Sequence, residues 1–207
     1  MTDSNYTAIA VLVDRSGSMG LIREDAEGAI NSFVEDQKKE PGRCTLRLAQ
    51  FDDSYEDVFK SSDIQTVKKY ILVPRGMTAL TDGIGKVVSD FGAELAALPE
   101  DERPGNVVVV IVTDGGENSS REYTIERVNE IITEQQDKYN WKFLFLAAGQ
   151  DAIATGAGYG LGAASTITYT TDNYAGTVST ASSLVTNLRS TGTFRGFSDE
   201  DRENAVK

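Results

Sequence analysis

Two apolar runs, each followed directly by an aspartate, constrain the fold of this chain more than any other feature. Residues 6–13 are almost continuously apolar or β-branched and precede Asp14, and residues 106–113 have the same character and precede Asp114. Such runs are typical of strands in a parallel sheet that helices cover on both faces. Ligand sites in these sheets lie beyond the carboxyl ends of the strands. The sequence therefore predicts that both aspartates lie at one rim of a sheet.

Helices and further strands alternate around these two runs. Apolar residues at helical spacing predict helices over about 22–34, 79–98, 125–135 and 178–188. Shorter apolar runs predict strands at 45–51, 55–59, 142–147 and 166–170, the second of them returning as an antiparallel edge strand. This order predicts a three-layer, doubly wound, Rossmann-like α/β fold. Its sheet is expected to have six mostly parallel strands with one antiparallel edge strand and helices on both faces.

Some segments allow more than one interpretation. Residues 61–74 could form a short helix with Ile64, Val67, Lys68 and Ile71 on one face. Ser119 and Glu122 have the spacing of a capping box for the helix that follows. We expect one domain over residues 1–192. Residues 193–207 are expected to be a charged tail, either a short solvated helix or a disordered end. Trp141, just before a predicted strand, is expected to pack in the core or at its rim.

Composition excludes several classes of function. The chain has 207 residues, of which 40% are hydrophobic and 25% charged, as in an ordinary soluble domain. Its net charge of −12 argues against nucleic-acid binding, which depends on clustered Lys and Arg. The absence of histidine removes Ser-His-Asp and Cys-His catalysis and nearly all zinc sites. Any chemistry must therefore rely on oxygen ligands or lysines.

The sequence also predicts where the protein works. The longest apolar run, 107–112, is too short to cross a bilayer, and residues 1–5 lack the features of a signal peptide. The single cysteine, Cys44, cannot form an internal disulfide and is expected to be a small buried residue. We therefore expect a cytoplasmic protein without membrane association, and a monomer by default.

The loop after the first run carries oxygen ligands. Asp14 is followed by hydroxyls at alternate positions, Ser16 and Ser18, in a glycine-containing turn. Read alone, this loop is equally compatible with a polar turn in which a serine only caps a helix. Two other predicted loops add Thr78, just before the helix over 79–98, and Asp114. Such donors suit Mg²⁺ or Mn²⁺, and hydroxyls could bind directly while carboxylates bind directly or through water.

Neighbouring residues leave some roles open. Thr81 lies three residues after Thr78 and could act in its place. Asp82 could accept hydrogen bonds from the metal ligands, or it could be an ordinary acidic residue in the first turn of a helix. Arg15, between Asp14 and Ser16, is expected to face solvent.

These five positions resemble the metal-ion-dependent adhesion site of the von Willebrand factor type A domain, which has the pattern Asp-x-Ser-x-Ser, then Thr, then Asp on three loops. The resemblance covers roughly residues 6–189, and residues 145–152 with the segment up to Tyr174 resemble stand-alone bacterial and phage-associated members. It implies Mg²⁺ or Mn²⁺, with an acidic group of a protein partner completing the coordination. It also implies a connection with AAA+ ATPases or phage systems. In this family pattern, the direct ligands are Ser16, Ser18 and Thr78, while Asp14 and Asp114 bind through water.

The leading functional hypothesis is therefore a non-enzymatic, metal-dependent protein-interaction module. The alternative is a Mg²⁺-dependent phosphohydrolase with Asp14 as its nucleophile. Phosphatases of the haloacid-dehalogenase type also need a second aspartate two residues later, where this chain has Ser16, and a catalytic lysine on a later loop. Dinucleotide binding is disfavoured because the first turn lacks Gly-x-Gly-x-x-Gly.

Overall fold

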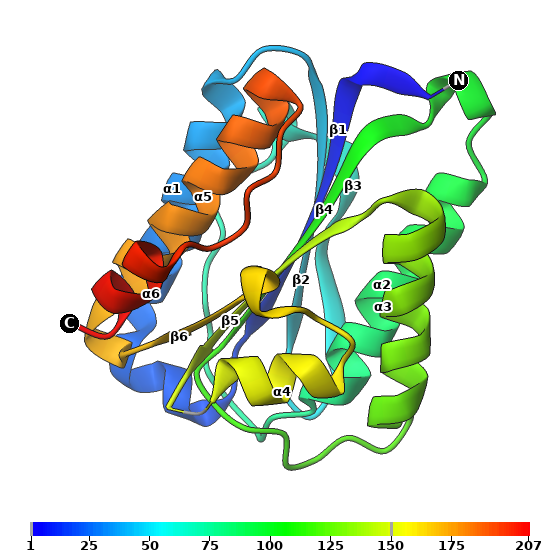
Figure 1. Ribbon diagram of the computed structural model, residues 1–207. Helices are drawn as coiled ribbons and strands as arrows, with labels where there is room; N and C mark the ends of the chain where they lie inside the picture. The colour runs from blue at the N-terminus through cyan, green and yellow to red at the C-terminus, as the bar shows by residue number, and fades with distance from the viewer. Residues whose placement is uncertain (1, 150) are drawn as a thin grey trace.

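The protein is a single six-stranded sheet between two layers of helices (Figure 1). The computed structural model describes residues 2–149 and 151–207, so Met1 and Gln150, the latter within the segment 145–152 considered above, lie outside the described part. The strand order is β3-β2-β1-β4-β5-β6; β3 is antiparallel to β2 and the other neighbours are parallel. The predicted fold class is confirmed. The strands are β1 (Asp3–Asp14), β2 (Arg43–Phe51), β3 (Tyr55–Asp63), β4 (Pro104–Thr113), β5 (Lys142–Ala148) and β6 (Thr166–Tyr169).

The helices divide between the two faces of the sheet (Figure 1). One face is covered by α1 (Arg23–Lys39), α5 (Tyr174–Thr191) and α6 (Asp199–Ala205). The other is covered by α2 (Leu80–Ala96), α3 (Ile125–Tyr139) and α4 (Ala152–Gly158). Short 3₁₀ turns complete the connections: η1 (Gly17–Ile22), η2 (Ile64–Thr66), η3 (Glu100–Glu102), η4 (Ala163–Ser165) and η5 (Thr171–Asn173).

The central strand β1 explains the continuous apolar run. Ile9, Val11 and Val13 belong to the core beneath α1 and α5, whereas Ala10 and Leu12 belong to the core beneath α2 and α3. Successive side chains of a strand point to opposite faces, so a strand covered on both faces must be apolar at every position. β1 pairs with β2 on one side and β4 on the other, so the residues that follow these strands share one rim.

Residues 61–74 do not contain the helix that the sequence allowed. β3 extends to Asp63, one 3₁₀ turn follows, and residues 67–75 then form neither helix nor strand where they pass α1. Side chains of α1 take its amide hydrogens: Tyr70 N donates to Asn31 Oδ1 (2.8 Å) and Leu72 N donates to Glu27 Oε2 (3.1 Å). The amides of Tyr70 and Leu72 therefore donate to side chains of α1 and not to carbonyl groups of their own segment. The helix that the apolar spacing predicts here is wrong for this reason.

The capping box predicted at Ser119 and Glu122 is also wrong. α3 begins at Ile125, and its N-cap is Thr124, whose hydroxyl accepts a hydrogen bond from Arg127 N (3.2 Å). The amide of Glu122 donates instead to Asp82 Oδ1 (2.9 Å), so the residues before α3 are held by α2.

The C-terminal segment adopts the helical alternative and packs against the sheet. Ser198 and Asp201 form a capping box at the start of α6. Ala205 is buried in the core, and its carbonyl accepts a hydrogen bond from Thr170 N (3.1 Å), just after β6. The segment is therefore a docked helix rather than a solvated one.

Two smaller expectations are confirmed. Trp141 is buried, with its ring 5.5 Å from that of Phe91 in an edge-on contact, and Cys44 is a buried free cysteine. Of the helices in the described residues, none is both long and apolar enough to span a membrane.

Candidate metal site

Asp14 is fixed at the carboxyl end of β1. Its side chain is fully buried. Oδ1 accepts a hydrogen bond from Ser16 N (2.7 Å), and Oδ2 accepts one from the hydroxyl of Thr113 (2.6 Å) at the end of β4. One bond comes from the loop of Asp14 itself and the other from the neighbouring strand, so this carboxylate joins the two strand ends.

Three more of the predicted residues meet directly beside it. The hydroxyl oxygens of Ser16 and Ser18 are 3.1 Å apart. Ser18 Oγ donates to Asp114 Oδ1 (2.9 Å), and Ser16 Oγ lies 3.5 Å from the same oxygen. The structure thus brings together Asp14, Ser16, Ser18 and Asp114 from two loops that are about a hundred residues apart in the sequence.

Thr78 reaches the same place from a third loop. This loop is held to the first by a hydrogen bond from Gly17 N to Gly76 O (3.2 Å). Thr78 is buried, its amide donates to Asn118 Oδ1 (2.9 Å), and a Cβ placed on Gly115 would lie 3.5 Å from its hydroxyl oxygen. Thr78 therefore lies beside the turn that follows Asp114.

Thr81, the alternative to Thr78, is engaged elsewhere. Its Oγ1 is 2.8 Å from the hydroxyl of Tyr159, within the core beneath α2. Asp82 is an acidic residue in the first turn of α2, which is one of the two roles expected for it. It also accepts three backbone hydrogen bonds, from the amides of residues 121–123, and so orders the loop before α3.

The prediction for Arg15 is wrong. Arg15 is buried, with 4% of its surface exposed, and its Nη1 donates to Glu56 Oε2 (2.6 Å). Its Nε lies 2.9 Å from Asp52 Oδ2. The side chain reaches the β2–β3 hairpin, whose two carboxylates compensate for the loss of hydration.

Asp52 is the residue of this region that the sequence did not reveal. Besides Arg15 it binds Arg75, whose Nε donates to Asp52 Oδ2 (2.7 Å). Its carbonyl accepts a hydrogen bond from Ala79 N (2.9 Å), and Arg75 N donates to Arg15 O (2.8 Å). We call Arg15, Asp52 and Arg75 the Asp52 clamp, because they join the Asp14 loop to the Thr78 loop. Residues 52–54 connect β2 to β3 at the same rim as Asp14.

The carboxylates of the candidate site lack such compensation. Burial raises the pKa of Asp14 to about 6, although hydrogen bonds from Thr113 and Ser16 oppose this, and the charge of Asp114 raises it further. Burial also raises the pKa of Asp114. Each direction means that the ionised carboxylate is less favourable here than in water.

The donors fit a hard divalent cation. All five side chains offer oxygen, three as hydroxyls and two as carboxylates. Across residues 2–149 and 151–207, no three Asp, Glu, Cys or His side chains gather as a metal-binding group. An ion at this rim would therefore depend on hydroxyl ligands, and few negative ligands would leave it able to attract another anion.

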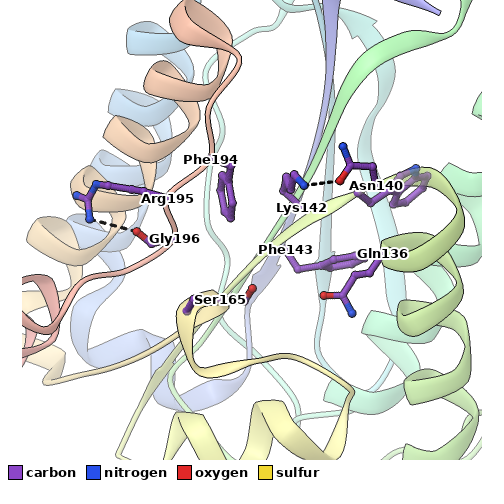
Figure 2. A pocket seen from close by; sticks show the side chains of 10 residues that line it. Gln136, Asn140, Lys142, Phe143, Ser165, Phe194, Arg195 and Gly196 are labelled. Atoms are coloured by element: carbon purple, nitrogen blue, oxygen red, sulfur yellow. Dashed lines mark hydrogen bonds between the residues drawn. The ribbon is translucent and has the colours of Figure 1, made fainter.

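A separate cleft of about 260 Å³ lies at the opposite ends of the strands, near the start of β5 (Figure 2). Figure 2 shows Phe194 on one side of it and Lys142 on the other, where Lys142 Nζ donates to Asn140 Oδ1 (2.6 Å). The other cation that lines it, Arg195, is paired with Asp201 (2.6 Å). None of the predicted site residues lies in this cleft, and its charged groups are satisfied within the protein.

The fold and this rim define a doubly wound α/β domain with a candidate cation site at the carboxyl ends of its strands. The family model of the von Willebrand factor type A domain matches residues 8–185. The chain therefore belongs to this family, whose domains commonly mediate metal-dependent protein interaction and are generally non-enzymatic. No curated protein matches the chain.

Solved structures show the same fold. Proximal thread matrix protein 1 from the mussel byssus, with a zinc-occupied MIDAS motif, is 18% identical with a TM-score of 0.60, over 88% of this chain and 46% of that chain. The von Willebrand factor domain of the type V pili tip protein Mfa5 from Porphyromonas gingivalis is 12% identical with a TM-score of 0.60. The match covers 94% of this chain and 98% of the Mfa5 domain. Manganese-loaded TRAP protein from Plasmodium vivax is 14% identical with a TM-score of 0.53. The match covers 84% of this chain and 72% of the TRAP chain. The chain spans about half the length of the mussel protein.

Proposed function

We propose that this protein is a non-enzymatic interaction module that binds an acidic group of a protein partner through Mg²⁺ or Mn²⁺. In this proposal the ion is held by Asp14, Ser16, Ser18, Thr78 and Asp114. One observation carries it: Ser16 and Ser18 share an oxygen of Asp114, at 3.5 and 2.9 Å, beside a buried Asp14 whose pKa the charge of Asp114 raises. A zinc-occupied MIDAS in the mussel protein and manganese in the Plasmodium protein support a divalent ion at this place in the fold.

The residues of the chain would act as follows. Ser16, Ser18 and Thr78 would provide neutral oxygens, and the two aspartates would hold these hydroxyls and ordered water in place. The bound ion would supply positive charge for a carboxylate of the partner. Ser18 is the most exposed of the proposed ligands, so the partner would approach over the η1 turn.

A phosphohydrolase has less support. A nucleophilic Asp14 would need a free oxygen facing the substrate. Instead, the side chain is fully buried and both oxygens accept hydrogen bonds, from Ser16 N and the Thr113 hydroxyl. Ser16 also stands where the second aspartate of that chemistry belongs.

Thermal and urea unfolding of EDTA-treated protein, titrated with Mg²⁺, Mn²⁺ and Ca²⁺, tests the metal site. An ion that binds only the folded state at a hundredfold excess over its Kd should add about 2.7 kcal/mol to the free energy of unfolding. Asp14→Ala should lose this response, and Ser32→Ala, on the exposed side of α1, should retain it. A wild-type protein that none of these ions stabilises would contradict the proposal.

Several expectations from the sequence stay predictions: the cytoplasmic location, the monomeric state, the bacterial or phage origin and the connection with AAA+ ATPases. The titration described above also tests which metal ion binds.

A further inference from the structure

Large apolar side chains are exposed directly beside the candidate metal site. Four of the eight that the described residues expose lie on two neighbouring segments: Leu21 (93% exposed) on η1, and Ile71 (62%), Val73 (59%) and Met77 (50%) on the connection before α2. We call these four residues the apolar rim. Leaving this much apolar surface in water is unfavourable unless a partner covers it.

Three backbone and side-chain contacts place the two segments side by side. Arg75 N donates to Arg15 O (2.8 Å), Gly17 N donates to Gly76 O (3.2 Å), and Arg23 Nε donates to Leu72 O (3.0 Å). Residues 72–76 therefore run along residues 15–23. Met77 directly precedes Thr78 and Leu21 lies three residues after Ser18, whereas Val73 and Ile71 lie farther along the connection.

The apolar residues of the connection occupy its solvent face. Tyr70 and Leu72 are buried, whereas Ile71 and Val73 between and after them are exposed. Alternate residues of an extended segment point to opposite sides. On an ordinary surface the outward positions would be polar, yet here both are β-branched and aliphatic.

The charges beside the rim favour an acidic partner. Arg75, whose side chain is 61% exposed, and Lys69, at 74%, lie on the same connection; Arg75 Nε also contacts Asp52 (2.7 Å), and Lys69 Nζ lies 3.9 Å from Glu27 Oε1. They stand out on a chain whose net charge is −12. A cation at the proposed site would add further positive charge next to them.

We propose that the apolar rim selects partners in which a carboxylate is flanked, within a few residues, by a large aliphatic side chain. This rests on the proposed function, because the carboxylate is taken to be the group that reaches the metal. The ion then supplies affinity for any accessible acid, and Leu21, Ile71, Val73 and Met77 distinguish one acidic segment from another.

Selection from a random peptide library with one fixed central Asp or Glu, displayed on phage, tests this inference. Selection in Mn²⁺ should enrich Leu, Ile, Val, Met or Phe close to the fixed acid, and elution with EDTA should release these peptides. For Leu21→Ser/Val73→Ser the aliphatic enrichment should disappear while peptide capture still depends on Mn²⁺. Each single change should weaken a selected peptide by about tenfold, the factor expected when burial of one large aliphatic side chain is lost.

Controls separate the possible results. Tyr139→Ser removes a side chain that is 58% exposed at the end of α3, away from the metal site, and should change nothing. Metal-dependent capture without aliphatic enrichment, or with enrichment unchanged in the double variant, would overturn the inference and leave the proposed function intact. No metal-dependent preference for the acidic library over one with central Asn or Gln would overturn both. Sedimentation that shows a wild-type dimer and a monomeric double variant would assign the rim to a second copy of the chain and overturn the inference.

Discussion

Asp14 and Asp52 lie at the carboxyl ends of neighbouring strands, at the same rim, and both are buried. They differ in the charged groups around them. Asp14 is the last residue of β1, paired across the sheet with Phe51, and Asp52 is the residue after Phe51. Asp52 lies against two guanidinium groups, those of Arg15 (2.9 Å) and Arg75 (2.7 Å). The carboxylate of Asp14 accepts hydrogen bonds from Ser16 N and the Thr113 hydroxyl, and the charge of Asp114 acts on it.

The acidities of the two groups follow from this difference. Burial raises the pKa of Asp14 to about 6. Burial opposes ionisation of Asp52 as well, but hydrogen bonds from Arg75 and Ser54 and the charge of Arg15 outweigh it, so the pKa of Asp52 is lowered. Asp52 therefore forms ion pairs within the protein, whereas Asp14 is buried with a raised pKa, and in the proposed function a bound cation would compensate its charge.

The largest effect is expected from a substitution that breaks the ion pairs of Asp52 with Arg15 and Arg75. Asp52→Asn leaves Arg15 buried with only Glu56 as a counter-charge, so the free energy of unfolding should fall by about 3 kcal/mol. Asp53→Asn, at the exposed neighbouring position, should change it by less than about 0.5 kcal/mol. Urea unfolding of both variants in EDTA measures the difference. Equal losses would mean that Asp52 does not act through the clamp.

The same change at Asp14 should have the opposite sign in metal-free protein. Asp14→Asn removes a charge whose burial cost, from a pKa shift of about two units, corresponds to at most about 3 kcal/mol. Because the amide has one acceptor oxygen and its NH2 cannot accept the second of the two hydrogen bonds that Asp14 accepts, part of this cost is offset and we expect a net gain of about 1 kcal/mol. Urea unfolding in EDTA at pH 7 should show this gain, and added Mg²⁺ or Mn²⁺ should stabilise wild type but not the variant. A clear loss of stability in EDTA would show that the Asp14 charge is compensated.

Acid titration of EDTA-treated protein sharpens the contrast. A pKa raised from 3.8 to about 6 means that folded protein binds the Asp14 proton more tightly, so Asp14 should lower stability as pH rises from about 4 to about 6. Asp52, with a lowered pKa, stabilises the fold above the ordinary value of 3.8, and this contribution is lost as pH falls below it. The free energy of unfolding should be measured across this range for both proteins. The decrease between about pH 4 and pH 6 that is due to Asp14 should be absent in Asp14→Asn. Parallel pH profiles for wild type and Asp14→Asn would contradict the assignment.

The smallest effects should distinguish two threonines. Thr78→Val removes a proposed metal ligand and should reduce the stabilisation by Mn²⁺ while changing metal-free stability little. Thr81→Val removes the hydrogen bond to Tyr159 and should cost about 1 kcal/mol with the metal response intact. Unfolding with and without Mn²⁺ compares the pair. A metal response lost in Thr81→Val but kept in Thr78→Val would reverse the two roles.

Features that depend on local periodicity could be predicted from the amino-acid sequence. Apolar residues at every position of 6–13 and 106–113 required strands buried on both faces, and the residues after such strands share a rim by geometry alone. This was enough to predict the fold class and to place Asp14, Ser16, Ser18, Thr78 and Asp114 on three neighbouring loops. That they bind a metal stays a prediction.

Only the tertiary structure decided which polar groups face each other across those loops. Arg15 is buried because the β2–β3 hairpin brings Asp52 and Glu56 to it, and no pattern within residues 11–20 shows that hairpin. Residues 67–73 stay extended because side chains of α1 bind their amides, at Tyr70 and Leu72. The spacing of apolar residues in a segment indicates which of its own side chains are buried. Partners distant in the sequence are set by the topology of the sheet, and they determine whether a buried charge is already neutralised or still requires a cation.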